Sequence, residues 1–133
     1  MDQTIQERLQ LFEQEEIVAP AIAGFVRNML LWLEERSKHP CTEESAGTLA
    51  SHLMMALERV RKGEGLGDTW DPDVHQEALQ LSILQPWAEH IRAQAQQELH
   101  LSLPDEEVDF LLLHLGAFFL HYNDPMLENI GAS

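Results

Sequence analysis

The chain has little cysteine, few basic residues and few aromatic side chains. Its 133 residues include one cysteine, 8 lysines and arginines against 23 aspartates and glutamates, and 7% aromatic residues. The lone Cys41 cannot form an internal disulfide and has no CxxC partner, so we expect a reduced, unreactive thiol in a cytoplasmic protein. With so few aromatic residues, leucine, alanine and isoleucine must fill most of the core.

The shortage of basic residues leaves a net charge of −15 at pH 7. Nucleic-acid affinity comes mainly from lysine and arginine side chains that neutralise phosphates, so direct binding to DNA or RNA is not expected. Anionic membranes are disfavoured for the same reason. A protein partner with a basic patch would be attracted, although a large net charge also serves simply to keep a domain soluble.

Long apolar runs and a signal peptide are also missing. The first four residues lack the basic and apolar regions of a secretion signal. The longest apolar stretch, residues 110–120, is about half of what a membrane span needs and predicts a buried core helix instead. Hydrophobic residues still make up 44% of the chain, which suffices for one globular domain.

The hydrophobic pattern is helical nearly throughout and predicts an all-α fold, a compact bundle of about five helices. Apolar residues recur at three- and four-residue spacing over residues 17 or 20 to 36, again over 42–63, and in the last helix from 104 to about 123. We expect a helical extension over residues 1–16, one helical domain over 17–123 and a flexible tail over 124–133. No internal repeat is visible.

Cap and break signals refine these helices. Asp2 or Thr4 can cap the first one, and Thr42 can cap the third, without a capping box because Ser45 stands where Glu or Gln usually does. Asp71 and the following proline predict the start of a long helix over residues 72–99, with a kink or break at Pro86. The glycine-rich residues 63–71 predict a loop, since their spacing does not match a phosphate-binding motif.

Two histidines stand inside apolar helical stretches. His52 has Arg59 two turns later on the same face, where the guanidinium can hydrogen-bond an anion held at the ring. His114 lies among leucines, with His121 two turns later and Glu107 two turns before. Taken alone, a histidine on a helix is usually a core or surface residue, so each can instead be a satisfied residue at the edge of the core.

The sequence gives little support for an enzymatic function or for a metal site. Glu107, His114 and His121 share a face, but their spacing puts successive ligands about 10 Å apart along the helix, too far for one ion. The sequence has no nucleophile motif, HExxH or similar signature. We therefore expect a non-enzyme without a metal or a cofactor.

Two stretches carry a family resemblance. Residues 51–63 (SHLMMALERVRKG) place a histidine before an apolar helix that ends in basic residues and glycine. Residues 101–106 (LSLPDE) lead to LHL at 113–115, and the two histidines are separated by 62 positions (114 − 52). In this order and with this gap, residues 17–121 resemble the PTS regulation domains (PRDs), the phosphorylation-controlled modules of bacterial sugar-operon antiterminators and activators.

The resemblance implies a helical regulatory domain of a sugar-utilisation system. It implies that His52 and His114 receive phosphoryl groups from the phosphocarrier protein or a sugar-specific component of the phosphotransferase system, with Arg59 near the phosphate. It also implies a homodimer. Relatives usually occur in tandem and fused to an effector, so we expect a small standalone member. Ser51 departs from the family pattern, which often has Asp before the first histidine.

Two other functions stay open. A constitutive protein–protein adaptor would bind through an apolar groove without phosphorylation, with Trp32, Trp70 or Trp87 as anchors; core packing is the alternative role of Trp32 and Trp87. A metal-dependent helical hydrolase would contain tightly bound metal.

Overall fold

A computed structural model describes residues 1–64 and 72–127 of the chain. The described residues form six α-helices, α1 (Gln3–Gln14), α2 (Pro20–Ser37), α3 (Glu43–Arg61), α4 (Pro72–Leu79), α5 (Gln85–Leu99) and α6 (Asp105–His121). Two short 3₁₀ helices, η1 (Ser82–Leu84) and η2 (Pro125–Leu127), complete the described part, which contains no strand. The all-α bundle predicted from the hydrophobic pattern is confirmed.

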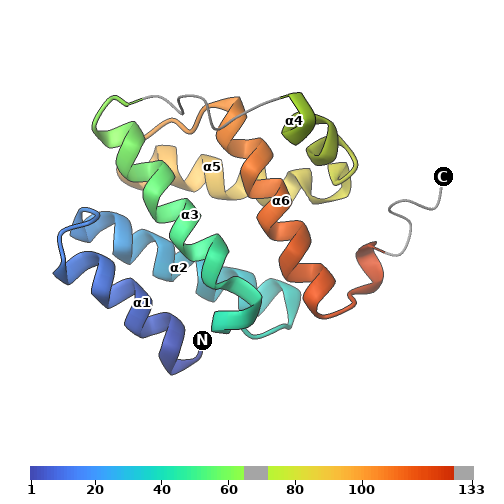
Figure 1. Ribbon diagram of the computed structural model, residues 1–133, viewed down its shortest axis with the longest axis horizontal. Helices are drawn as coiled ribbons and strands as arrows, with labels where there is room; N and C mark the ends of the chain where they lie inside the picture. The colour runs from blue at the N-terminus through green and yellow to red at the C-terminus, as the bar shows by residue number, and fades with distance from the viewer. Residues whose placement is uncertain (65–71, 128–133) are drawn as a thin grey trace.

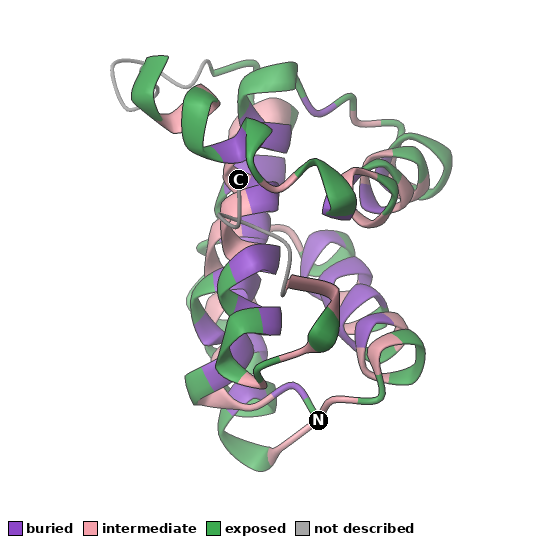
Figure 2. Ribbon diagram, turned by 90° about the vertical axis from the view of Figure 1, so that its right-hand side faces the viewer, coloured by how far each residue is buried: buried purple, intermediate pink, exposed green. Residues whose placement is uncertain are grey.

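The bundle holds α3 and α6 side by side at its centre. Figure 1 shows the two helices on the face toward the viewer, with α2 behind α3 and α5 passing behind α6. α1 packs against α2 and α3, and α4 packs against α6. Figure 2 shows buried residues on the inward sides of the helices and exposed residues on the outward sides.

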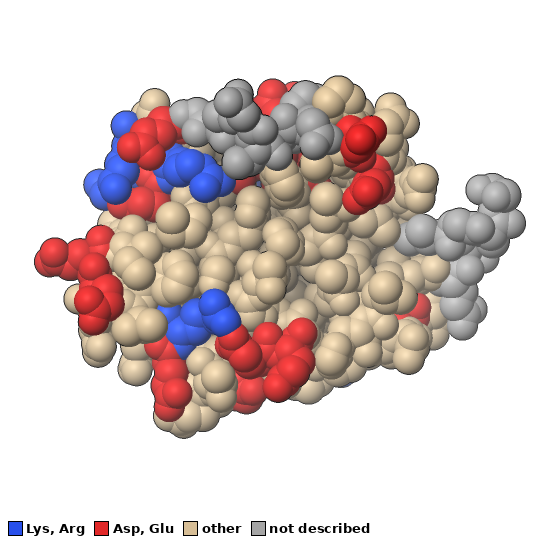
Figure 3. Space-filling view, viewed as in Figure 1, with Lys and Arg blue, Asp and Glu red and all other residues tan. Residues whose placement is uncertain are grey.

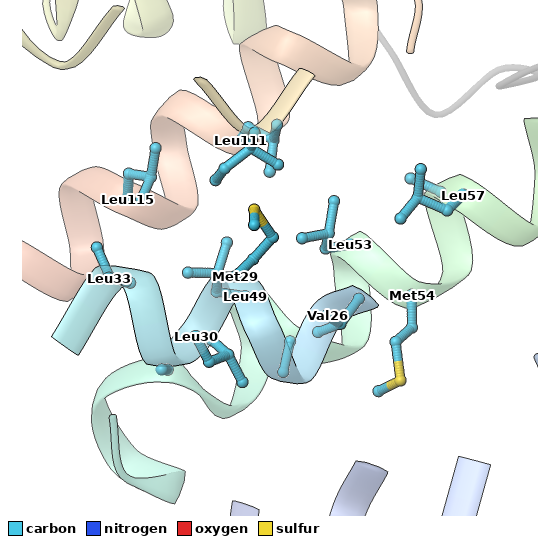
Figure 4. Close-up of a cluster of buried hydrophobic side chains, with 14 of the residues drawn as sticks. Val26, Met29, Leu30, Leu33, Leu49, Leu53, Met54, Leu57, Leu111 and Leu115 are labelled. Atoms are coloured by element: carbon cyan, nitrogen blue, oxygen red, sulfur yellow. The ribbon is translucent and has the colours of Figure 1, made fainter. Parts of the chain in front are cut away.

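The core is mostly aliphatic, with three buried phenylalanines, Phe25, Phe118 and Phe119. Burial of such side chains removes apolar surface from water and is the main favourable term in folding. Figure 4 shows leucines of α3 packed against side chains of α2 and α6; the labelled residues are Val26, Met29, Leu30, Leu33, Leu49, Leu53, Met54, Leu57, Leu111 and Leu115. This shared core fixes how α3 and α6 face each other.

The N-terminal helix is part of the same core. Ile5 and Leu9 of α1 are fully buried, and Asp2 caps the helix by accepting from the backbone N–H of Ile5. At the other end, the Asp124 carboxylate lies 2.7 Å from Nε2 of His39, and the Tyr122 hydroxyl donates to the Pro40 carbonyl. The beginning of the predicted tail is therefore attached to the α2–α3 connection, while residues 128–133 lie outside the described residues.

Two expectations about the helices change. Thr42 and Ser45 do form a capping box, because the short Ser45 hydroxyl accepts from the backbone N–H of Thr42 just as a longer Glu or Gln side chain would. The break into two helices expected within residues 72–99 is present, since α4 and α5 are joined through η1, but its position differs. The break expected at Pro86 comes a few residues earlier, so Pro86 occupies the first turn of α5, where its missing N–H costs nothing.

Some of the expectations concern residues that the structure does not describe. Asp71 as a helix cap, most of the glycine-rich loop and Trp70 fall among residues 65–71, which the structure does not describe. Within the described residues, none of the helices combines the length and hydrophobicity that a membrane span requires.

Candidate functional site

The packing of α3 on α6 brings the two predicted histidines together. His52 projects from the middle of α3, and His114 from the middle of α6. Their ring centroids are 4.8 Å apart and their planes are inclined by 40°. Phe110, one turn before His114, covers another side of the His52 ring at a centroid distance of 5.2 Å. Residues separated by 62 positions in sequence thus form one aromatic cluster.

A buried carboxylate completes the cluster. Glu107 lies in the first turn of α6 with a side chain only 4% exposed. Its Oε2 lies 3.2 Å from Nε2 of His52, and its Oε1 accepts a hydrogen bond of 3.1 Å from a guanidinium nitrogen of Arg59. The anion that Arg59 was expected to hold beside His52 is therefore already present in the chain as Glu107.

The pKa values in the cluster follow from this arrangement. Burial raises the pKa of the Glu107 carboxyl group, but His52 and Arg59 together lower it by more, so that it lies below its ordinary value and the group is ionised at neutral pH. Burial, and then the neighbouring His52, lowers the pKa of His114 from 6.5 to about 4. His114 is therefore a neutral imidazole at pH 7, with a lone pair available on one ring nitrogen.

His114 is reached through a groove between α3 and α6. The groove has a volume of about 290 Å³, and its lining residues are Glu44, Ser45, Thr48, Leu49, His114, Ala117, Leu120 and His121. Figure 3 shows the face that carries α3 and α6: its centre is mostly uncharged, and the charged side chains gather toward the edge. On this face the negative charge of the acidic protein lies toward the edge and not over the centre.

A family model described as PRD domain matches residues 27–118. The chain belongs to the PRD domain family. The matched residues include His52, Arg59, Glu107 and His114, and they lie within the range of 17–121 over which the resemblance was noted. No curated protein and no solved structure matches the chain.

Ser51, the residue before His52, has a partner on another helix of this PRD domain. Its hydroxyl accepts a hydrogen bond of 2.7 Å from the Arg8 guanidinium of α1. Arg8 also pairs with Glu43, in the first turn of α3. Arg8 thus links the Glu43 carboxylate to the position that precedes His52, and α1 is attached to α3 beside the histidine.

The metal alternative gains no geometric support. His121 lines the groove and contacts Tyr122 edge-on, away from the Glu107 ion pairs. Among residues 1–64 and 72–127, no group of three or more His, Cys, Asp or Glu side chains is placed to hold a metal ion. Cys41 is fully buried, and burial raises the pKa of its thiol to about 12, so it is a poor nucleophile.

Glu107 is the residue of the cluster whose role the sequence did not reveal. In the sequence, Glu107 stands out only as part of the candidate metal set with His114 and His121, whose spacing is too wide for one ion. The available signal was its position: an acidic residue seven positions before a histidine falls on the same helical face, and that face of α6 is apolar. A charged residue on a buried face requires a partner, which here is the pair formed by His52 and Arg59.

Proposed function

We propose that this PRD domain is a regulatory, non-catalytic module of a sugar-utilisation system, controlled by phosphorylation of His52 and His114 by phosphotransferase-system proteins. The observation that carries the proposal is the meeting of these two histidines between α3 and α6, beside Arg59 and an accessible groove. A neutral imidazole at pH 7 is a suitable phosphoryl acceptor, because its lone pair is not blocked by a proton.

The control follows from charge. A phosphoryl group adds about −1.5 to −2 charge at one point. On a ring between α3 and α6, this charge is repelled by the buried carboxylate of Glu107. Such a change favours a different packing of α3 on α6, and hence a different partner surface. We propose a cytoplasmic homodimer as the assembly that responds, supported by Met55 on α3 and Leu120 on α6, whose large apolar side chains are exposed.

The test is phosphate incorporation. The protein is incubated with phosphoenolpyruvate, enzyme I and the phosphocarrier protein, and its intact mass is measured at alkaline pH, which preserves phosphohistidine. The proposal expects a gain of phosphate that maps to His52 or His114 and disappears in the double variant His52→Ala/His114→Ala. His90→Ala is the matched control, because His90 stacks on Trp32 on α2 and is not part of the cluster. No gain from a demonstrably active donor refutes the proposal.

The adaptor remains as a second candidate because of a separate surface pocket. Trp32, Arg36, Pro86, Trp87 and His90 line a pocket of about 240 Å³ between α2 and α5. Trp32 and Trp87 also pack against the hydrophobic core, which agrees with core packing as their alternative role. An adaptor keeps its affinity for its partner when both His52 and His114 are replaced, whereas a phosphorylation switch does not.

A further inference from the structure

The two ring nitrogens of His52 have different surroundings. Nε2 is buried and faces Oε2 of Glu107 at 3.2 Å, although neither atom has an aligned hydrogen bond. Nδ1 has no hydrogen-bond partner among the described residues, and it is in contact with solvent within the 18% of the side chain that is exposed. One nitrogen thus points into the protein and the other out of it.

Glu107 determines which nitrogen carries the proton. A neutral imidazole has one N–H and one lone pair, and an ionised carboxylate can only accept. A lone pair on Nε2 would face the carboxylate oxygen across 3.2 Å and be repelled, whereas an N–H there is attracted. Arg59 holds the other carboxylate oxygen and keeps the group in place. The favoured tautomer of His52 is therefore the one protonated at Nε2.

We propose that Glu107 is a positioning residue that holds the His52 proton on Nε2, so that Nδ1 is the atom that receives the phosphoryl group. The inference rests on the proposed function and adds to it the reacting atom and the residue that selects it. Attack by Nε2 would instead require the carboxylate to move and would place the phosphoryl group directly against it in a buried site.

With this geometry, each bond made or broken in the phosphoryl transfer can be accounted for. The Nδ1 lone pair of His52 attacks the phosphorus of a phosphohistidine on the donor protein. The phosphorus–nitrogen bond to the donor breaks, and its electron pair returns to the donor's ring nitrogen. The His52 proton stays on Nε2, where the Glu107 carboxylate neutralises the positive charge that develops on the ring.

The tautomer is measured first, on the unphosphorylated protein. Long-range ¹H–¹⁵N correlation spectra at about pH 8, where an ordinary histidine is neutral, identify the protonated nitrogen. We expect His52 to be protonated at Nε2 in the wild type and in Glu106→Gln, a matched control at an exposed neighbouring position. Glu107→Gln should shift His52 toward a mixture of tautomers, because an amide can both donate and accept. A wild-type His52 protonated at Nδ1 overturns the inference, and this result does not require the Glu107 variant to fold.

The phosphorylated atom is measured second. After transfer from phosphoenolpyruvate through enzyme I and the phosphocarrier protein, ³¹P and ¹⁵N spectra of ¹⁵N-histidine-labelled protein distinguish the two phosphohistidine isomers. We expect the Nδ1 isomer at His52 in the wild type and loss of this preference in Glu107→Gln. The Nε2 isomer at His52 in the wild type overturns the inference. If an active donor leaves His52 unmodified, the proposed role of His52 fails, and the tautomer measurement alone decides whether Glu107 positions the ring.

Discussion

The imidazole rings of His52 and His114 lie against each other, with centroids 4.8 Å apart. At this distance the charge state of one ring affects the other, because little water separates them. A proton or a phosphoryl group on one ring therefore changes what the second ring can accept. The ionised Glu107 beside His52 adds a negative charge to the same small volume.

Proximity predicts that the two histidines do not carry phosphoryl groups at the same time. Each group brings about −1.5 to −2 charge, and two of them on adjacent rings repel strongly in a partly buried site. We expect intact mass spectra to show unmodified and singly phosphorylated protein only. His52→Ala and His114→Ala should each still accept one group. Accumulation of a doubly phosphorylated species in the wild type would contradict this prediction.

The lowered pKa of His114 predicts that the protein loses stability in mild acid. Its pKa is about 4 in the folded protein, below the ordinary value of 6.5 that applies to the unfolded chain. As the pH falls through 6.5, the unfolded state binds a proton that the folded state does not yet bind, so the free energy of unfolding decreases between pH 6.5 and about 4. Urea unfolding of the wild type at several pH values should show this decrease.

The matched variant is His114→Gln, which cannot titrate in this range. It should lose less stability than the wild type over the same pH interval, whatever its stability at neutral pH. A histidine NMR titration of the wild type gives an independent check, since His114 should stay neutral after ordinary histidines have been protonated. An equal loss of stability in both proteins would show that the pH dependence arises elsewhere.

Much of the fold and part of the site could be predicted from local patterns. Apolar residues at helical spacing located α2, α3 and α6 to within a few residues, and they placed His52 and His114 on helices. Local patterns do not state how one helix is rotated against another. The contact between Glu107 and the pair His52 and Arg59 depends on that rotation, which the packing of side chains from several helices determines together.

The errors in local structure have equally specific causes. The box formed by Thr42 and Ser45 uses a shorter side chain than the motif describes, so the pattern did not match. The break between α4 and α5 precedes Pro86, since a proline suits the first turn of a helix better than its interior. The pairing of Arg8 with Ser51 connects α1 to α3, and no sequence rule links residues that are far apart in this way.

Removal of the Glu107 carboxylate should destabilise the protein strongly. Glu107→Ala leaves Arg59 and His52 facing each other without the anion between them, and breaking a buried ion pair in this way typically costs about 3–5 kcal/mol. Chemical denaturation at pH 7 measures the change in the free energy of unfolding. Glu106→Ala, at an exposed position of the same helical turn, should change it by less than about 1 kcal/mol, the size of a charge–dipole contribution. Equal effects of the two variants would contradict the proposed ion-pair cluster.

The surroundings of two helical glycines predict different effects of the same substitution. Among the described residues, a Cβ atom on Gly24 of α2 would meet no atom within 4 Å apart from its chain neighbours and the backbone of its own helix, so Gly24→Ala should stabilise the protein by about 0.5–1 kcal/mol through its higher helix propensity. A Cβ atom on Gly116 of α6 would lie 2.8 Å from Cδ1 of Leu81, just before η1. Gly116→Ala must therefore displace the end of the flexible Leu81 side chain, which offsets the gain in helix propensity, so it should stabilise the protein less than Gly24→Ala does.

The cause of the Gly116 effect can be isolated with a double-mutant cycle. If Leu81 is the obstacle, the Gly116→Ala substitution should stabilise more in a Leu81→Ala background than in the wild type, because the space that the Cβ needs is then free. The two substitutions would be non-additive, as expected for residues in direct contact. If the two changes in the free energy of unfolding are additive, the Leu81 side chain is not the obstacle, and the effect of Gly116→Ala has another cause.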